Sequence, residues 1–508
     1  MKITRKTFFK VSGGGAVASV IAGAAGNQGN TVSAQTTPKP KKLEGAAIMG
    51  ATTAVTKFIV DAKLSAMPAD VAAQGKRCLA DGLGVTLAGS TMHGSALIRD
   101  YVRSVSEKKE ATAIGADAFA TSAAQAALIN AGSGHAMDYD DTQLSTTPDR
   151  TFGLLTHPTM PVLAAALAVA ERRGASGAAF VEAFLVGFEV ECKIAEAIDP
   201  NHYERGFHST GTAGTFGAAA AAAKLLNLNA QAIGHMLAIA ASMSSGIRVN
   251  FGSMTKPLHA ARAAQNGVVA AELAARGFTG GDNGLDGQWG YFQVFGGGAD
   301  LDRLIPVMGK PYAIVSPGVS IKPYPCGSLS HPTLDAMLKA VTDHDLKPDQ
   351  IKAVRVRAGN NILDPLRYKI AKNELEAKFS LPFLMSSIIL RRKAGVREFT
   401  DEFVAEAPVQ RMMERVTGVF DPKIDAMGYD KIRSVVEIDL TDGRSLVQAS
   451  DDRYRGGPDR PFTREELHAK FVDCAQLTLP AARIQQALTQ IESVESLGNV
   501  TELVKTLS

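Results

Sequence analysis

Six short segments of the sequence carry side chains that could transfer protons and bind anions. They read GHAMDYDDT (134–142), THPTMP (156–161), GFHSTGTAGTFG (206–217), TKPLHAARAAQNG (255–267), IKPYPCGSLSHPTLDA (321–336) and EAKFSLPF (376–383). Imidazoles and carboxylates exchange protons near neutral pH, and ammonium groups bind anions. The combination predicts one pocket built from distant parts of the chain.

Two lysines stand where the chain would hold an ammonium group in place. Lys256 precedes Pro257, the expected first residue of a helix, and a helix N-terminus beside an ammonium group makes an anion site. His259 follows within one turn and could join that site. Lys322 precedes Pro323-Tyr324-Pro325, a stiff extended run. The structural alternative for Lys256 is a solvated lysine at the start of a core helix.

Three histidines and one aspartate are further candidates for the site. His157 lies at a loop-to-helix junction, where an imidazole can reach a cleft. His208 lies just before a helix rich in small residues, and a buried structural histidine is the alternative there. His135 and Asp138 are three residues apart and share a face if their segment is helical. Asp138 is expected to orient a partner or to transfer a proton.

Other kinds of site fit the sequence less well. Asp138, Asp140 and Asp141 could suggest a metal centre, but EF-hand spacing and an H-E-x-x-H element are absent, so no metal is predicted. The segment 206–217 has the glycines of a phosphate loop without its G-K-[ST] ending. Cys326 lacks an evident basic partner, which disfavours a nucleophile.

The composition bounds the class of protein. A chain of 508 residues is long enough for two or three domains. Its charge is nearly balanced, with a net value of +3, so nothing points to nucleic-acid binding. Few aromatic residues and abundant Ala and Gly favour closely packed helices. The four cysteines are far apart, which predicts neither a zinc site nor a disulfide framework.

The N-terminus has the layout of a bacterial export signal. A basic start is followed by a weakly apolar stretch (11–25) and by the small residues Val32-Ser33-Ala34. The run 4–10 resembles a twin-arginine signal with Lys6 in place of the second arginine. We expect 1–34 to be an export signal, 35–45 a linker and the protein to be periplasmic without membrane attachment after cleavage. The alternatives are a disordered tail and, if the signal is not used, a cytoplasmic protein.

The remaining chain predicts three parts. Residues 46–315 have a helical pattern, with prolines near helix starts and glycines after helix ends. Residues 316–457 contain alternating strands and a hairpin turn at Asp442-Gly443, and 458–508 return to helix with a capping box at Thr463 and Glu466. The predicted fold is mostly α with a smaller α+β domain, a large all-helical domain interrupted by an α/β lid domain, with a cleft between them.

The six segments, in this order, resemble the MmgE/PrpD superfamily, which includes 2-methylcitrate dehydratase, cis-aconitate decarboxylase and an iminodisuccinate epimerase. The resemblance runs from about Gly45 to near the C-terminus. It implies a helical domain plus a lid, a homodimer, and a site that acts on di- and tricarboxylates without metal or organic cofactor. The family's active-site positions fall on the following residues of this sequence: Asp138, Thr142, His157, His208, Lys256 and Lys322.

Three features depart from the family's pattern. Gly327 replaces a second lid histidine of cis-aconitate decarboxylase, and Phe383 replaces a tyrosine of an AKFSLPY-like motif. Loss of the tyrosine hydroxyl would remove a proton donor or a substrate hydrogen bond, so decarboxylation of cis-aconitate is not the favoured reaction. An insertion-like stretch between Gln143 and Leu155 is expected to reshape the pocket.

The predicted activity is dehydration of a 2-methylcitrate-like hydroxy acid, a small carboxylic acid. Lys256, His208 and Lys322, with His259, would bind carboxylates. His157 and Asp138 would transfer protons, and Thr142 would position the substrate. Three alternatives stay open: an epimerase or isomerase of a dicarboxylate, a non-catalytic carboxylate-binding protein, and a metallohydrolase built on the acidic cluster.

Overall fold

A computed structural model describes residues 42–144 and 155–508. The predicted export signal (1–34) lies outside the described residues. Residues 35–41 of the predicted linker (35–45) also lie outside them, as do residues 145–154 of the insertion-like stretch between Gln143 and Leu155.

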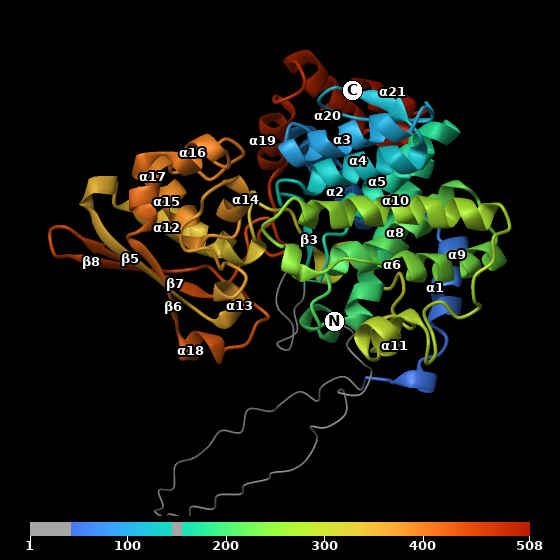
Figure 1. Ribbon diagram of the computed structural model, residues 1–508, viewed down its shortest axis with the longest axis horizontal. Helices are drawn as coiled ribbons and strands as arrows, with labels where there is room; N and C mark the ends of the chain where they lie inside the picture. The colour runs from blue at the N-terminus through green and yellow to red at the C-terminus, as the bar shows by residue number, and fades with distance from the viewer. Residues whose placement is uncertain (1–41, 145–154) are drawn as a thin grey trace, which may run out of the picture. The chain divides into compact units, whose positions relative to one another are not determined.

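Residues 51–296 fold mainly into helices (Figure 1). Small residues let these helices approach closely: a Cβ atom added at Gly187 in α6 would lie 2.5 Å from the carbonyl oxygen of Gly217 in α8. The expectation of closely packed helices is therefore confirmed. The helices of this part are α1 (Ala51–Asp61), α2 (Ala69–Gly89), α3 (His93–Val105), α4 (Ala123–His135), α5 (Thr159–Arg173), α6 (Gly177–Ile198), α7 (Asn201–Glu204), α8 (Ser209–Leu225), α9 (Ala230–Met243), α10 (Thr255–Ala275) and α11 (Tyr291–Gly296).

Two helix boundaries bear on the site. Gly174 follows α5 with a φ of 59°, as expected for a glycine that ends a helix. Helix α10 begins at Thr255, two residues before Pro257. Lys256 therefore lies inside the first turn of α10. The sequence had suggested a position at the cap, and that prediction is wrong.

A mixed four-stranded sheet forms the centre of the smaller part, in the order β6-β5-β7-β8. Strand β5 (Ile351–Ala358) pairs in parallel with β6 (Val416–Phe420) and antiparallel with β7 (Ser434–Leu440). Strand β8 (Ser445–Ala449) completes the predicted hairpin, whose turn contains Gly443 at a φ of 93°. The accompanying helices are α12 (His331–Asp343), α13 (Asn360–Leu363), α14 (Glu374–Ala377), α15 (Leu381–Arg391), α16 (Asp401–Ala405), α17 (Ala407–Met413) and α18 (Pro422–Asp425).

The chain ends in helices again: α19 (Arg464–Ala475), α20 (Ala481–Glu492) and α21 (Thr501–Thr506). The capping box of α19 is confirmed, since Thr463 accepts from the amide of Glu466 and Glu466 accepts from that of Thr463. Helix α19 packs against α2.

The buried apolar residues form two main cores. One joins residues between 48 and 321 to residues between 462 and 507, and we call these parts together the helical body. The other lies mainly between 324 and 454, and we call that part the α+β region. The fold class predicted from the sequence, mostly α with a smaller α+β part, is confirmed.

The helical body is not entirely helical. Strands β1 (Ala111–Ala113) and β2 (Phe119–Thr121) pair antiparallel, as do β3 (Thr142–Gln143) and β4 (Val319–Ser320). These strands are two or three residues long, too short to leave a period in the sequence. Among the described residues, no helix combines the length and apolar character needed to cross a membrane.

Candidate active site

A pocket with about 550 Å³ of space between its atoms, part of it open solvent, is lined by residues of both the helical body and the α+β region. Its charged or imidazole side chains are Asp138, His157, His208, Lys256 and Lys322. Hydroxyl groups are supplied by Thr156, Tyr203, Ser209, Thr210 and Ser328, and the rest of the lining is Leu155, Phe251, Gly327, Leu329, Pro365, Leu366 and Phe379.

Helix starts place several of these groups. His157 is two residues before α5, Ser209 and Thr210 open α8, and Lys256 is in the first turn of α10. The first turn of a helix carries partial positive charge and unpaired amides. The cavity therefore favours an anionic ligand.

Asp138 is the centre of the charged cluster. It follows the end of α4 with a φ of 51°, a left-handed conformation that Asp tolerates better than most residues. Its Oδ1 accepts from Lys256 Nζ at 2.6 Å and from Lys322 Nζ at 3.0 Å. Although burial alone would raise the pKa of Asp138, these two ammonium groups hold it well below its usual range. Asp138 is therefore a carboxylate at neutral pH.

Lys322 is completely buried and fully engaged by the protein. Besides Asp138 Oδ1, its ammonium group donates to the carbonyl oxygens of Asp138 at 2.7 Å and of Cys326 at 3.0 Å. An ammonium group has three hydrogens, so no donor is left for a ligand. Lys322 contributes charge to the cavity, whereas Lys256 donates one hydrogen bond among the described residues and keeps two hydrogens for a ligand.

The C-terminal helices reach this cluster. Lys470 in α19 donates to the carbonyl oxygens of Lys322 at 2.8 Å and of Tyr139 at 2.9 Å. It also forms a buried ion pair with Asp81 of α2. The backbone on both sides of the Asp138–Lys322 contact is thus held from the end of the chain.

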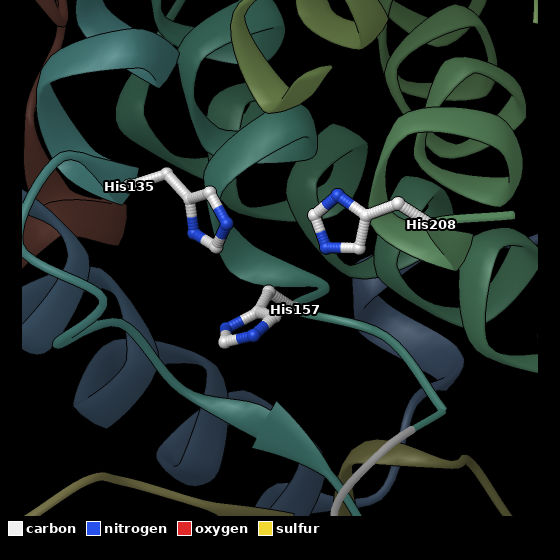
Figure 2. Close-up of side chains that lie close together, drawn as sticks. All are labelled: His135, His157 and His208. Carbon is white, nitrogen blue, oxygen red and sulfur yellow. The ribbon is translucent and has the colours of Figure 1, made fainter. Parts of the chain in front are cut away.

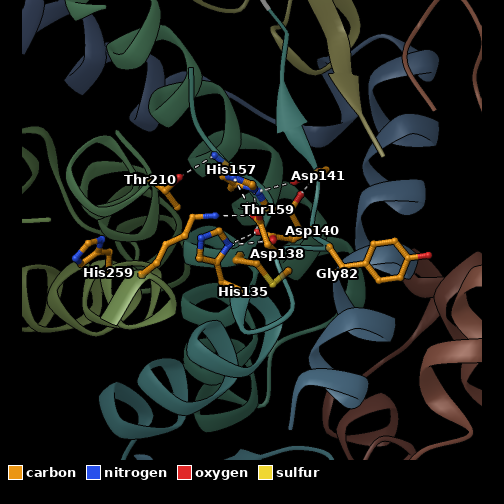
Figure 3. A network of polar contacts seen from close by, with 12 residues as sticks. Gly82, His135, Asp138, Asp140, Asp141, His157, Thr159, Thr210 and His259 are labelled. Carbon is orange, nitrogen blue, oxygen red and sulfur yellow. Dashed lines mark hydrogen bonds and ion pairs between the residues drawn. The ribbon is translucent and has the colours of Figure 1, made fainter. Parts of the chain in front are cut away.

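His157 lies between two carboxylates, as Figure 3 shows. Its Nε2 is 3.7 Å from Asp138 Oδ1 and its Nδ1 is 3.4 Å from Asp140 Oδ2, both longer than a good hydrogen bond. The backbone amide of His157 donates to Thr210 Oγ1 at 3.0 Å and so fixes the loop. Burial lowers the pKa of His157, which favours the neutral imidazole, the form that can accept a proton.

His208 is supported from behind by His259. Their Nδ1 atoms are 3.0 Å apart, so one of them must be unprotonated and accept the hydrogen bond. Burial lowers the pKa of His208 well below its usual range and that of His259 to about 4. His208 lines the cavity, whereas His259 does not and can only orient His208.

Three imidazoles could also hold a metal ion. Ring nitrogens of His135, His157 and His208 lie within 4.8 Å of one another. Figure 2 shows the three side chains grouped together. Asp140 contacts Nδ1 of His135 at 2.9 Å, the kind of contact that orients metal-binding histidines. The charges of Lys256 and Lys322 beside this cluster oppose a dication. A second group with this spacing consists of His135, Asp138, Asp140 and His157, but Lys256 and Lys322 already bind the Asp138 carboxylate and so oppose a dication there.

Thr142, the remaining predicted site residue, lies outside the cavity lining. It is buried in β3 and pairs with Ser320 of β4, two residues before Lys322. Its contribution is therefore to the strand pair that carries the Lys322 segment.

The cavity is enclosed by two segments that match one protein family. Residues 53–304 match the MmgE/PrpD N-terminal domain and residues 324–495 match the MmgE/PrpD C-terminal domain. The chain belongs to the MmgE/PrpD family.

Several MmgE/PrpD relatives resemble the chain over most of its length. It is 27% identical over 446 residues to the cis-aconitate decarboxylase of Mus musculus, which covers 85% of this chain and 88% of the relative. The Homo sapiens enzyme is 27% identical over 444 residues, with 85% and 89% covered. A cis-aconitate decarboxylase-like protein of Aspergillus oryzae is 23% identical over 479 residues, with 90% and 97% covered.

Two of the three departures from the MmgE/PrpD pattern are single residues, and they fall in different places. Gly327 lines the cavity, so the missing histidine does change its wall. Phe383 does not line it: the side chain is buried in the core of the α+β region against Phe399 and Phe403. Phe383 itself therefore contributes no surface to the cavity.

Sequence reasoning assigned no role in this MmgE/PrpD site to Asp140 or to Lys470. Asp140 bridges His135 and His157, and its pKa is held below the usual range by these imidazoles despite burial. Both His135 and Asp140 lie in the 134–142 segment, so the segment itself was the available signal. Lys470 carries no such signal, because it lies in an ordinary amphipathic helix.

Proposed function

We propose that this protein is a cofactor-independent lyase that acts on a small carboxylic acid by removing a proton next to a carboxylate, with loss of water. The observation that carries the proposal is a neutral, partly buried His157 facing a cavity that also holds Lys256 and the Asp138 carboxylate. A base and a fixed cation around one anion-binding space are what α-proton removal requires.

The geometry supports a specific division of roles. His157 accepts the α-proton, and Lys256 binds the substrate carboxylate and stabilises the enolate-like charge that develops. His208, oriented by His259, hydrogen-bonds the departing hydroxide, which leaves as water once it takes up the proton that His157 removed. Asp138 and Lys322 set the charge of the site, because Lys322 has no hydrogen left for substrate.

Decarboxylation is the second candidate reaction. Relatives that align over more than four-fifths of this chain are named cis-aconitate decarboxylases. The same residues without a leaving group would give epimerisation, which remains the third possible outcome.

Proton NMR in D2O tests the proposal. The purified protein is incubated with a panel of hydroxy, tricarboxylic and imino acids, including 2-methylcitrate and cis-aconitate, and a His157→Gln variant is the control. Loss of water from a hydroxy acid in the wild type alone supports the proposal. Release of CO2 supports the decarboxylase, and deuterium uptake without elimination supports the epimerase. Binding without any of these changes would support a non-catalytic carboxylate-binding protein and overturn the proposal.

A further inference from the structure

Asp140 is a completely buried carboxylate in the loop between α4 and β3, and it faces two imidazoles of the site (Figure 3). Both of its oxygens lie 2.9 Å from Nδ1 of His135. Its Oδ2 lies 3.4 Å from Nδ1 of His157. Among the described residues, only these two imidazoles form ion pairs with Asp140, and no lysine or arginine does. The carboxylate therefore acts on the imidazoles alone.

The contact with His135 fixes where that ring carries its hydrogen. Imidazoles hold the pKa of Asp140 below its usual range despite burial, so Asp140 is ionised and can only accept hydrogen bonds. Burial lowers the pKa of His135 to about 4, so this ring is neutral and has a single N–H. That hydrogen is on Nδ1, which donates to Asp140. His135 thus holds the carboxylate in place beside His157.

His157 has a carboxylate on each side, and the two are not equivalent. Its Nε2 is 3.7 Å from Asp138 Oδ1, and its Nδ1 is 3.4 Å from Asp140 Oδ2. The charge of Asp138 is already balanced by the ammonium groups of Lys256 and Lys322. Asp140 is nearer and has no such cation among the described residues. The single hydrogen of neutral His157 therefore favours Nδ1, and Nε2 is left unprotonated.

We propose that Asp140 is the positioning residue of the base: it holds the hydrogen of His157 on Nδ1 and leaves Nε2 free to accept the α-proton. This inference rests on the proposed function and identifies the atom of His157 that takes the proton. The C–H bond breaks, its electron pair stays on the substrate as enolate-like charge, and the proton forms an N–H bond at Nε2. The resulting imidazolium lies between two carboxylates, which stabilise it.

The same contacts distinguish His157 from His208. Among the described residues, no carboxylate forms an ion pair with His208, and Lys256 and the neighbouring imidazoles lower its pKa further than burial does. An imidazolium at His208 would have no counterion in the protein, whereas one at His157 has Asp140. The buried carboxylate therefore makes His157 the stronger base of the two.

The position of the hydrogen can be measured without turnover. Long-range proton–nitrogen NMR spectra of the full-length protein, labelled with ¹⁵N in its histidines, distinguish rings with Nδ1–H from rings with Nε2–H. The sequence has ten histidines, and the His157→Gln variant identifies the His157 signal by its loss. At pH 7.5 the wild-type His157 ring should be neutral with its hydrogen on Nδ1. A hydrogen on Nε2 would overturn the inference, so the wild-type spectrum decides even if no variant folds.

Asp140→Asn removes the charge and keeps the shape of the side chain. The Nδ1–H preference of His157 should be lost, and kcat should fall at least about 100-fold on the acid that the NMR panel identifies. KM should change less than about threefold because Asp140 does not line the cavity and kcat alone depends on the base. An unchanged His157 spectrum, or a fall confined to 1/KM, would contradict the assignment.

Asp141→Asn is the matched control at the next residue. Asp141 is also buried, but it accepts from Thr159 Oγ1 at 2.6 Å and, among the described residues, pairs with no histidine. It should keep the His157 spectrum and kcat within about threefold, and equal losses of kcat in the two variants would make Asp140 merely structural. An Nδ1–H ring at His157 in a protein without turnover would overturn the proposed function alone. Turnover with an Nε2–H ring would overturn this inference alone.

Discussion

Replacing Asp138 by Asn should destabilise the protein strongly. The substitution keeps the shape of the side chain but removes the charge that pairs with Lys256 at 2.6 Å and Lys322 at 3.0 Å. At an effective dielectric constant of about 20, each contact is a Coulomb attraction of about 6 kcal/mol, most of which offsets the desolvation of the charges. Breaking one buried ion pair costs about 3–5 kcal/mol, and we expect a loss of at least that size.

The loss should depend on pH in a defined direction. In the wild type, the pKa of Asp138 is depressed, so its contribution to stability is present above about pH 3.9, the unfolded value, and is lost as the pH falls through the folded pKa. In Asp138→Asn, the two unpaired, charged ammonium groups lower the free energy of unfolding at neutral pH. That penalty is relieved as the pH rises toward about 10.4, the pKa of an unfolded lysine. The two proteins should therefore converge in stability in alkaline solution.

Urea unfolding followed by circular dichroism measures this effect between pH 6 and pH 10. Asp61→Asn, which removes an exposed partner of Lys57, is the matched control and should change little. The double variant Asp138→Asn/Lys322→Met leaves one unpaired ammonium group in place of two, so it should be more stable than Asp138→Asn alone. A loss below about 1 kcal/mol in Asp138→Asn, or a double variant less stable than the single one, would refute the buried cluster.

Four further predictions concern activity. His157→Gln should lower kcat by about 10²- to 10⁴-fold with an unchanged circular dichroism spectrum, and a variant as active as the wild type would exclude the proposed base. Because burial lowers the pKa of His157, kcat/KM should hold constant down to below pH 6.5, and an acid limb above that value would contradict the assignment. Cys326→Ala should stay active, and iodoacetamide at pH 8 should leave Cys326 unlabelled because burial raises its pKa to about 12. Dialysis against EDTA should leave turnover unchanged, since the charges of Lys256 and Lys322 oppose a dication, and loss of activity restored by Zn²⁺ would assign a metal to the imidazole cluster.

Much of the site could be anticipated because its residues lie in short segments that carry their own signals. A lysine before Pro257 and a histidine before Pro158 both point to helix starts, and the structure brings Lys256 and His157 to one cavity. The hairpin at Gly443 and the capping box at Thr463 were likewise predicted by local chemistry. Local signals of this kind concern neighbours in the chain, so they survive in any tertiary context.

The contacts between distant segments left no such trace. Nothing in the sequence indicates that Lys322 donates all its hydrogen bonds to Asp138 and Cys326. Nor does it indicate that β3 pairs with β4 across almost 180 residues of chain. Phe383 shows the opposite error. Its motif suggested a pocket residue, but the side chain enters the core beneath α15, and Phe379, before that helix, lines the cavity in its place. Tertiary packing decides which face of a short helix is turned to the cavity. A sequence motif does not specify that packing.

The hydrogen bonds that Lys470 donates from α19 have a consequence for the synthesis of the chain. Ribosomes make the chain from its N-terminus, so all five charged or imidazole groups of the cavity are synthesised before the residue that holds the carbonyls of Tyr139 and Lys322. A nascent chain that ends before α19 has every reactive group and no fixed site. We therefore expect a molecule that lacks α19 to lose the contacts that hold this backbone, and with them most of the proposed activity.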